Sequence, residues 1–183
     1  QEEALSVVLE ALQTRKIHHK GLHYRHDVIG DYEIFPACVQ QPHPPLYMAA
    51  GSERSIAFAA RHGFGLMLST LPSFDTLAVQ TEFYREKMKD ALEQWTHNPG
   101  FGQVDQARWV YVAETDAKAK EESKAGILHI LKTFMSRGAG GYMGNVSEKA
   151  MDTELDYDEL AQTTLLHGSP ETVIERLRKL ESM

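Results

Sequence analysis

The chain has 183 residues, 42% of them hydrophobic and 25% charged, which is the composition of an ordinary soluble globular protein. Its 26 acidic and 19 basic side chains give a formal charge of -7, which argues against nucleic acid or an anionic membrane as the main partner, because both attract basic surfaces. No apolar run approaches the ~20 residues needed to span a bilayer, and Cys38 is the only cysteine, so we expect a single domain in a reducing cytoplasm.

The first 35 residues are predicted to form a helix followed by turns. Apolar side chains recur at helical spacing over residues 4–13. Residues 17–35 are polar, rich in His and Tyr and interrupted by Gly21 and Gly30, which favours short extended pieces and turns. Because Gln1 is not an initiator methionine and the chain begins inside the expected helix, we expect a fragment of a longer protein.

A strand, a turn and a helix are predicted after the proline-rich stretch 36–45. Residues 46–50 are continuously apolar, as expected for a strand buried on both faces of a parallel sheet. Residues 53–62 are predicted to be a helix, with Ser52 as its N-cap and Gly63 as its stop.

The later elements continue to alternate between strand and helix. We expect strands at 65–69 and 108–113 and helices at 74–96, 116–137 and 170–180. Four glycines in residues 138–144 indicate a mobile loop, which is either a lid or a linker. Alternation of this kind indicates an α/β fold with a parallel sheet. Three strands alone would leave two edges unpaired, so we expect partner strands outside this chain.

The turn at residues 50–55 is the main candidate for a binding site. The first N–H groups of a helix have no intrahelical acceptor, and the helix dipole favours an anion beside them. At the end of a buried strand, such a turn favours the phosphate of a bound cofactor. The plainer interpretation is that Ser52 is an ordinary N-cap and Ser55 a polar surface residue.

Four stretches of the sequence resemble the bacterial luciferase-like flavin monooxygenases. They are QPHPPLYMAAGS at 41–52, AFAARHG at 57–63, VYVAETDA at 110–117 and GSPETV at 168–173. Each stretch is only moderately specific, but the four occur in the order and spacing of the family and extend over nearly the whole chain.

The resemblance implies a (β/α)8 TIM barrel that this chain covers only in part, as a single partial domain over residues 1–183. The chain would start in the helix before the fifth strand and stop just before the eighth. Members of the family use reduced FMN from a separate flavin reductase, or F420 in some branches. With FMN and O2 they oxygenate a small organic substrate, and they are commonly homodimers.

The family's phosphate-binding loop corresponds to residues 50–55 of this chain. By that resemblance Ala50 and Gly51 lie near the flavin through their backbones, and Ser52 and Ser55 contact its phosphate. Arg54, at the same helix start, has the charge to pair with the phosphate. The family's catalytic histidine lies in the amino-terminal half, so no catalytic residue is predicted here.

Three other functions stay open on the sequence alone. The first is an F420-dependent oxidoreductase of the same superfamily, which transfers hydride without oxygen. The second is a non-catalytic flavin-binding subunit. The third is a structural fragment that binds no ligand.

A group of histidines, His18, His19, His23 and His26, raises the alternative of a metal site. His19 and His23 would share one face of a helix. Gly21 argues against a helix there, however, and no cysteine or carboxylate completes a zinc spacing. We therefore predict no metal, and place these histidines on an exposed hairpin near the barrel mouth.

Overall fold

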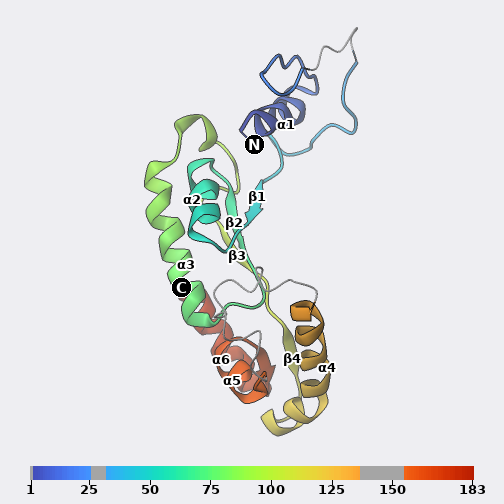
Figure 1. The fold of residues 1–183 in the computed structure, drawn as a ribbon, viewed down its shortest axis with the longest axis vertical. Coiled ribbons are helices and arrows are strands. Elements are labelled where there is room, and N and C mark those ends of the chain that lie inside the picture. Colours follow the sequence, from blue (N-terminus) through green and yellow to red (C-terminus); the bar gives the residue numbers. More distant parts are fainter. Residues whose placement is uncertain (1, 26–31, 137–154) are drawn as a thin grey trace.

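The computed structural model describes residues 2–25, 32–136 and 155–183. Within these ranges the chain forms six α-helices, two short 3₁₀ helices and five strands. In order they are α1 (Glu2–Thr14), β1 (Tyr47–Ala49), α2 (Glu53–Arg61), β2 (Gly65–Leu68), α3 (Phe74–Lys87), η1 (Met88–Asp90), η2 (Glu93–Trp95), β3 (Val104–Gln106), β4 (Val110–Val112), α4 (Asp116–Ser136), α5 (Tyr157–Thr163), β5 (Leu166–Gly168) and α6 (Pro170–Glu181). Figure 1 shows an elongated arrangement, with α1 at one end and α4 and α5 at the other.

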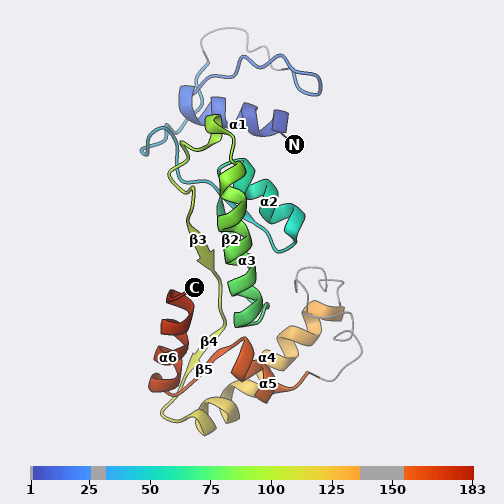
Figure 2. The same cartoon turned by 90° about the vertical axis from the view of Figure 1, so that its left-hand side faces the viewer.

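The described strands form two small sheets, and every pairing in them is parallel. The first sheet has the order β1-β2-β3, and the second pairs β4 with β5. Figures 1 and 2 show α2 and α3 together on one side of the first sheet. The predicted α/β class with parallel βαβ units is therefore confirmed.

Helix α2 begins and ends where the sequence predicts. Ser52 is its N-cap, and the Ser52 hydroxyl accepts a hydrogen bond from the N–H of Ser55. Gly63 follows the helix with a φ of 66°, in the left-handed region. A Cβ added to Gly63 would lie 2.1 Å from the carbonyl oxygen of Trp95, so no other residue fits this close approach without displacing the backbone.

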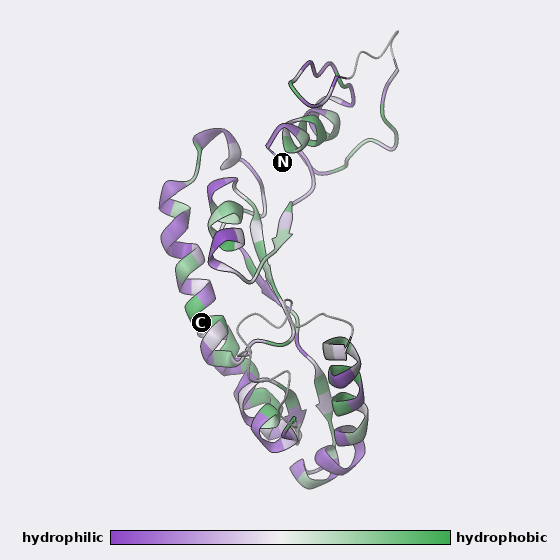
Figure 3. Cartoon of the chain, in the orientation of Figure 1, coloured by the Kyte–Doolittle hydropathy of each residue, from purple (hydrophilic) through white to green (hydrophobic). Residues whose placement is uncertain are grey.

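The largest hydrophobic core lies between the first sheet and its two helices. It contains Ile56, Ala59, Ala60, Leu66, Leu68, Phe74, Leu77, Tyr84, Leu166 and Val173. Leu166 of β5 and Val173 of α6 pack into it, so the carboxy-terminal elements share the core of the β1–β3 sheet. Figure 3 shows α3 and α4 banded in hydrophilic and hydrophobic colours, as expected for helices with one face on a core.

The opposite face of the first sheet carries no described helix. Three residues that are paired in register on adjacent strands are exposed there: Ala49 of β1, Met67 of β2 and Asp105 of β3. Met67 is 47% exposed. Strands buried on both faces were expected, and that prediction is wrong for the described residues because the helices cover one face only. Met67 is accordingly not a core residue, whereas Leu68 is 3% exposed and packs in the core.

The region 74–113 differs from the sequence prediction in two ways. The helix expected over 74–96 ends at Lys87, and two 3₁₀ turns follow it. Leu92 is extended there, and its N–H bonds the carbonyl oxygen of Arg61 at 3.0 Å, so a tertiary contact replaces continued helix. The strand expected at 108–113 is β4, which pairs with β5 and not with the β1–β2 sheet.

Two short strands are absent from the sequence prediction. The third strand of the first sheet is β3, whose sequence Val-Asp-Gln lacks a strong apolar pattern. The other is β5, which is fully buried between α4 and α6. The predicted loop at 138–144 lies outside the described residues. No helix in the described ranges is both long and apolar enough to cross a membrane.

Candidate functional site

The turn at residues 50–55 joins the carboxyl end of β1 to the start of α2. Its two serines form a reciprocal capping box. The Ser52 hydroxyl accepts from the N–H of Ser55 at 3.3 Å, and the Ser55 hydroxyl accepts from the N–H of Ser52 at 3.1 Å and of Gly51 at 3.3 Å. The two hydroxyl oxygens are 2.9 Å apart. The N-cap role of Ser52 is therefore present in the structure.

Two backbone N–H groups of this turn remain open. Those of Glu53 and Arg54 donate to no protein acceptor in the part of the chain that the structure describes, as expected for the first turn of a helix. The Arg54 side chain is exposed and forms no ion pair with any described residue. Glu53 places an exposed carboxylate on the same turn, which opposes an anion. The N–H of Ala50 is already used, since it donates to the carbonyl oxygen of Met67 at 3.2 Å.

The space beside Gly51 that a side chain would occupy is open. A Cβ added there would find a single neighbour within 4 Å, the Nε2 atom of Gln80 at 3.9 Å. That nitrogen donates to the carbonyl oxygen of Gly51 at 2.8 Å. Gln80 lies on α3, 29 residues further along the chain, so sequence reasoning did not connect it to the turn.

The start of α6 is occupied in a different way. Its N-cap Ser169 donates its N–H to Oδ1 of Asp116 at 2.6 Å, and Thr172 donates its hydroxyl to Oδ2 at 3.0 Å. These hydrogen bonds, that of the Ser169 N–H first, hold the pKa of the Asp116 carboxyl below its usual value. The helix start at 169–172 thus already has an anion from the protein beside it. No carboxylate of the described residues is bonded to the turn at 50–55 in this way.

A partly buried arginine, Arg108, lies just beyond the carboxyl end of β3. Arg108 donates through Nη1 to the carbonyl oxygens of Thr70 and Pro72, at 2.9 and 3.1 Å. Burial lowers the pKa of Arg108 to about 10, which leaves it positively charged at neutral pH. The arginine therefore fixes the loop after β2 to the end of β3.

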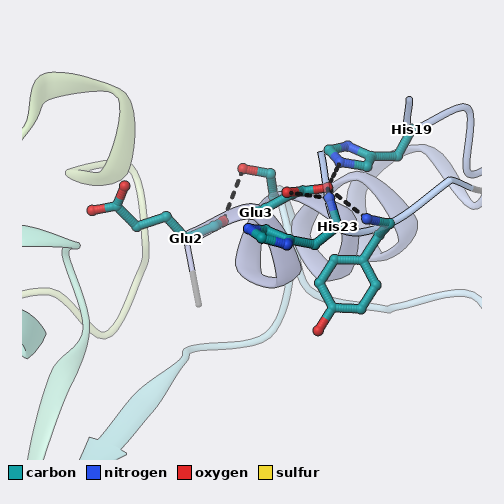
Figure 4. A network of polar contacts seen from close by, with 6 residues as sticks. Glu2, Glu3, His19 and His23 are labelled. Carbon is teal, nitrogen blue, oxygen red and sulfur yellow. Dashed lines mark hydrogen bonds and ion pairs between the residues drawn. The ribbon is translucent and has the colours of Figure 1, made fainter. Parts of the chain in front are cut away.

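The predicted histidine hairpin packs against α1. Lys20 and Arg25 form an isolated antiparallel bridge. The Glu3 carboxylate accepts from the N–H groups of His23 and Tyr24, at 3.0 and 2.8 Å, and contacts Nε2 of His19 at 3.2 Å (Figure 4). Partial desolvation raises the pKa of Glu3, but these hydrogen bonds outweigh it and lower the pKa to about 2.

No group of three potential metal ligands occurs among the described residues. His26 lies outside them.

The hairpin lies at the other end of α2 from the turn, so its predicted place near the mouth is wrong. Glu2 points away from Glu3 in Figure 4, and its Oε1 contacts Nε2 of His62 at 3.0 Å. His62 follows the last residue of α2, roughly 15 Å along the helix axis from Ser52 at 1.5 Å per residue. Through Glu2 and Glu3, α1 thus ties the hairpin to the amino end of the sheet.

A buried Ser–His–Tyr cluster joins α4, α5 and β5. The Ser123 hydroxyl donates to the carbonyl oxygen of Ala119 at 2.7 Å, and it lies 2.9 Å from Nδ1 of His167 and 3.0 Å from the Tyr157 hydroxyl. Burial, and then the charge of Arg176, lower the pKa of His167. Since the serine proton is used by Ala119, the histidine and the tyrosine can both donate to the serine oxygen, which satisfies the cluster internally. We interpret the cluster as a structural contact between these three elements. Ser123 and His167 are 44 residues apart, so the sequence alone does not predict that they meet.

Comparison with known families identifies the chain. A family model described as luciferase-like monooxygenase matches residues 1–183. The chain belongs to the luciferase-like monooxygenase family. The predicted resemblance is thereby confirmed. No curated protein sequence gives a match.

Three solved structures align with this chain over nearly its whole length. Monooxygenase RslO1 from Streptomyces bottropensis aligns with a TM-score of 0.59 at 20% identity, over 98% of this chain and 50% of that chain. The FMN-bound oxygenating constituent of 3,6-diketocamphane monooxygenase from Pseudomonas putida, a type II Baeyer-Villiger monooxygenase, aligns with a TM-score of 0.64 at 20% identity, over 99% and 52%. The coenzyme F420 dependent tetrahydromethanopterin reductase from Methanopyrus kandleri aligns with a TM-score of 0.62 at 17% identity, over 99% and 53%.

At these low identities, the structural alignments show similarity of fold alone. The chain spans about half the length of the solved structures it matches.

Proposed function

We propose that this chain is the flavin-phosphate-binding part of a monooxygenase that uses reduced FMN and O2 to oxygenate a small organic substrate. Residues 1–183 form a single partial domain of a (β/α)8 barrel in this proposal. The missing strands would pair with the free edges of the β1–β3 sheet, since β1 and β3 each pair with β2 alone among the described strands. Membership of the luciferase-like family and the FMN-bound relative of similar fold support the proposal.

The observation that carries the proposal is the open helix start at residues 53–54. Two N–H groups there lack a protein acceptor, Gly51 leaves room beside them, and Arg54 supplies an unpaired positive charge in the described part of the chain. These are the groups that a phosphate requires. At the start of α6, by contrast, the Asp116 carboxylate accepts from the Ser169 N–H and the Thr172 hydroxyl, so an anion from the protein already lies beside that helix start.

The serines would contribute by redirecting their hydroxyl protons. The Ser55 hydroxyl donates to the carbonyl oxygen of Ser52 at 2.9 Å, and that proton can turn to a phosphate oxygen. The exchange replaces a neutral hydrogen bond with a charge-assisted one, which is roughly twice as strong. Gly51 and Ala50 would line the approach through their backbones. The bound flavin, once reduced, supplies the chemistry that activates O2.

An F420-dependent oxidoreductase is the alternative within the superfamily. The similarity of fold to the F420-dependent reductase favours it to the same degree as the FMN-bound relative favours FMN. The absorbance spectrum of the cofactor retained by the complete protein separates the two, because oxidised FMN and F420 absorb at different wavelengths. Tight flavin retention without turnover would instead indicate a non-catalytic flavin-binding subunit.

The remaining parts of the proposal concern the complete protein. We propose that it takes reduced flavin from a separate flavin reductase, forms a homodimer and works in the cytoplasm. No residue of this chain is assigned a catalytic role.

The double variant Ser52→Ala with Ser55→Ala tests the phosphate site in the complete protein. We expect FMN binding, measured by calorimetry, to weaken by roughly 2–4 kcal/mol, because each charge-assisted hydrogen bond contributes ~1.5–3 kcal/mol. The matched control is Ser169→Ala with Thr172→Ala. That pair includes the corresponding N-cap bond on α6, from the Thr172 N–H to the Ser169 hydroxyl at 3.3 Å, although the Ser169 N–H there bonds Asp116. Its replacement should leave FMN affinity unchanged. Unchanged affinity in the first variant would remove the phosphate assignment.

A further inference from the structure

Gln80 is a buried amide whose two ends have different surroundings. Its side chain extends from α3 toward the turn, and the residue is only 6% exposed. Nε2 donates to the carbonyl oxygen of Gly51 at 2.8 Å. Oε1 is buried and has no hydrogen-bond partner among the described residues. Within that part of the chain the amide makes a single hydrogen bond, and that bond goes to the backbone of the candidate site.

The bonded carbonyl controls the direction of a neighbouring N–H. The Gly51–Ser52 peptide is trans, so its carbonyl oxygen and its N–H point in opposite directions. With the oxygen held toward α3, the N–H of Ser52 points away from α3, where it bonds the Ser55 hydroxyl at 3.1 Å. A flipped peptide would lose this bond and turn the negative end of the carbonyl toward a bound anion.

Sterics alone do not select this orientation. Gly51 has no side chain, and the nearest atom to its absent Cβ is Nε2 of Gln80 at 3.9 Å. Glycine also adopts backbone angles that other residues avoid. The hydrogen bond from Gln80 to the carbonyl oxygen thus acts together with the bond from the Ser52 N–H to the Ser55 hydroxyl to distinguish one peptide orientation from the other.

We propose that Gln80 is a positioning residue of the phosphate turn, which holds the Gly51–Ser52 peptide so that the capping serines face the phosphate. This inference rests on the proposed function. Gln80 acts through the backbone of the turn and touches no reacting atom.

A packing role alone does not account for the amide. Burying Oε1 without a partner costs free energy, and an apolar side chain of similar volume would avoid that cost. Thr81, the next residue, offers the matched comparison. It is 2% exposed and its hydroxyl oxygen is also buried without a partner in the described ranges, but it forms no hydrogen bond to the turn.

The test compares FMN with riboflavin, which lacks the phosphate, in the complete protein. Gln80→Met keeps the length of the side chain and removes its donor. We expect the dissociation constant for FMN to rise roughly tenfold, the effect of one lost hydrogen bond on a charged ligand, with that for riboflavin unchanged. Thr81→Val should change neither constant. Gln80→Asn, which keeps the amide but shortens its reach by one methylene group, should behave as Gln80→Met does and serves if the methionine variant does not fold.

The outcomes separate this inference from the proposed function. An unchanged ratio of the two constants in the Gln80 variants, or equal losses for both flavins, would overturn the positioning role. If Ser52→Ala with Ser55→Ala still lowers the preference for FMN in that case, the phosphate site stands without Gln80. A wild-type protein with no preference for FMN over riboflavin would overturn both.

Discussion

Glu53 places a carboxylate on the first turn of α2, beside the two backbone N–H groups that have no described protein acceptor. In the free helix this charge interacts favourably with the positive end of the dipole. A bound phosphate at the same place would be repelled by it. Helix stability and phosphate binding therefore make opposite demands on this residue.

Glu53→Gln is expected to move the two properties in opposite directions. Removal of the negative charge should tighten FMN binding by about 0.3–1 kcal/mol and lower the free energy of unfolding by a similar amount. Calorimetric titration and urea denaturation of the complete protein measure the two effects. Glu175→Gln, an exposed glutamate on α6, is the control and should change neither. Weaker FMN binding in Glu53→Gln would contradict a phosphate at this turn.

The ionisation of Glu3 makes the stability of the folded state depend on pH. Its folded-state pKa of about 2 lies below the ordinary value of 4.5, because the N–H groups of His23 and Tyr24 and the ring of His19 outweigh the opposing desolvation. A lowered pKa means that the carboxylate stabilises the folded state above pH 4.5, and that this contribution is lost as the pH falls toward 2.

We expect the Glu3 carboxyl carbon to titrate by NMR with a midpoint of about 2. The amide signals of His23 and Tyr24 should shift over the same pH range, because both groups donate to this carboxylate. Glu3→Gln should abolish that transition in the two amides. A midpoint at 4.5, the ordinary value, would show that the hairpin is not held by Glu3.

At the scale of elements, Asn98 joins three segments at the amino end of the first sheet. Its side chain donates to the carbonyl oxygens of Leu46 and Gly63, at 2.8 and 2.7 Å, and accepts from the N–H groups of Leu46 and Gly100, at 2.9 and 3.1 Å. The residue is 9% exposed, so removal of the amide leaves buried backbone groups without partners.

Asn98→Ala should lower the free energy of unfolding by roughly 2–4 kcal/mol, because several buried hydrogen bonds are lost together. The neighbouring exposed His97 provides the control, and His97→Ala should stay within about 0.5 kcal/mol of the wild type. Urea denaturation of the complete protein gives both values. Similar midpoints for the two variants would mean that Asn98 does not hold these segments together.

The elements that sequence reasoning placed correctly are those fixed by local signals. Helix α2 has a serine cap, a capping box and a glycine stop within twelve residues, and α6 has the Ser-Pro-Glu start that the sequence shows. Strands β3 and β5 were missed because parallel pairing and burial between distant helices define them, and neither leaves a strong periodic pattern in three residues.

In the candidate site too, local sequence signals predicted some residues, whereas others depend on the tertiary fold. The serines of the turn are only three residues apart in sequence and could be predicted, and the family resemblance indicated their use. Gln80 could not be predicted, since only the packing of α3 against α2 brings it to Gly51. The location of the histidine hairpin was wrong for a related reason, because the contacts of Glu2 and Glu3 that set it depend on the tertiary fold.

At the scale of the whole molecule, the first sheet is covered by helices on one face and bare on the other in the described part of the chain. The bare face carries Met67, and β1 and β3 each have one unpaired edge among the described strands. Both features agree with a chain that spans about half the length of the solved structures it matches. The turn at 50–55 lies at the carboxyl end of the sheet, the end at which barrel enzymes bind their ligands.

A crystal structure of the complete protein with FMN tests this account most directly. We expect the phosphate within hydrogen-bond distance of the N–H groups of Glu53 and Arg54, with the Ser52 and Ser55 hydroxyls turned toward it and the Gln80 amide still on the Gly51 carbonyl. A phosphate bound elsewhere, with the capping box unchanged and those two N–H groups facing solvent, would contradict the account.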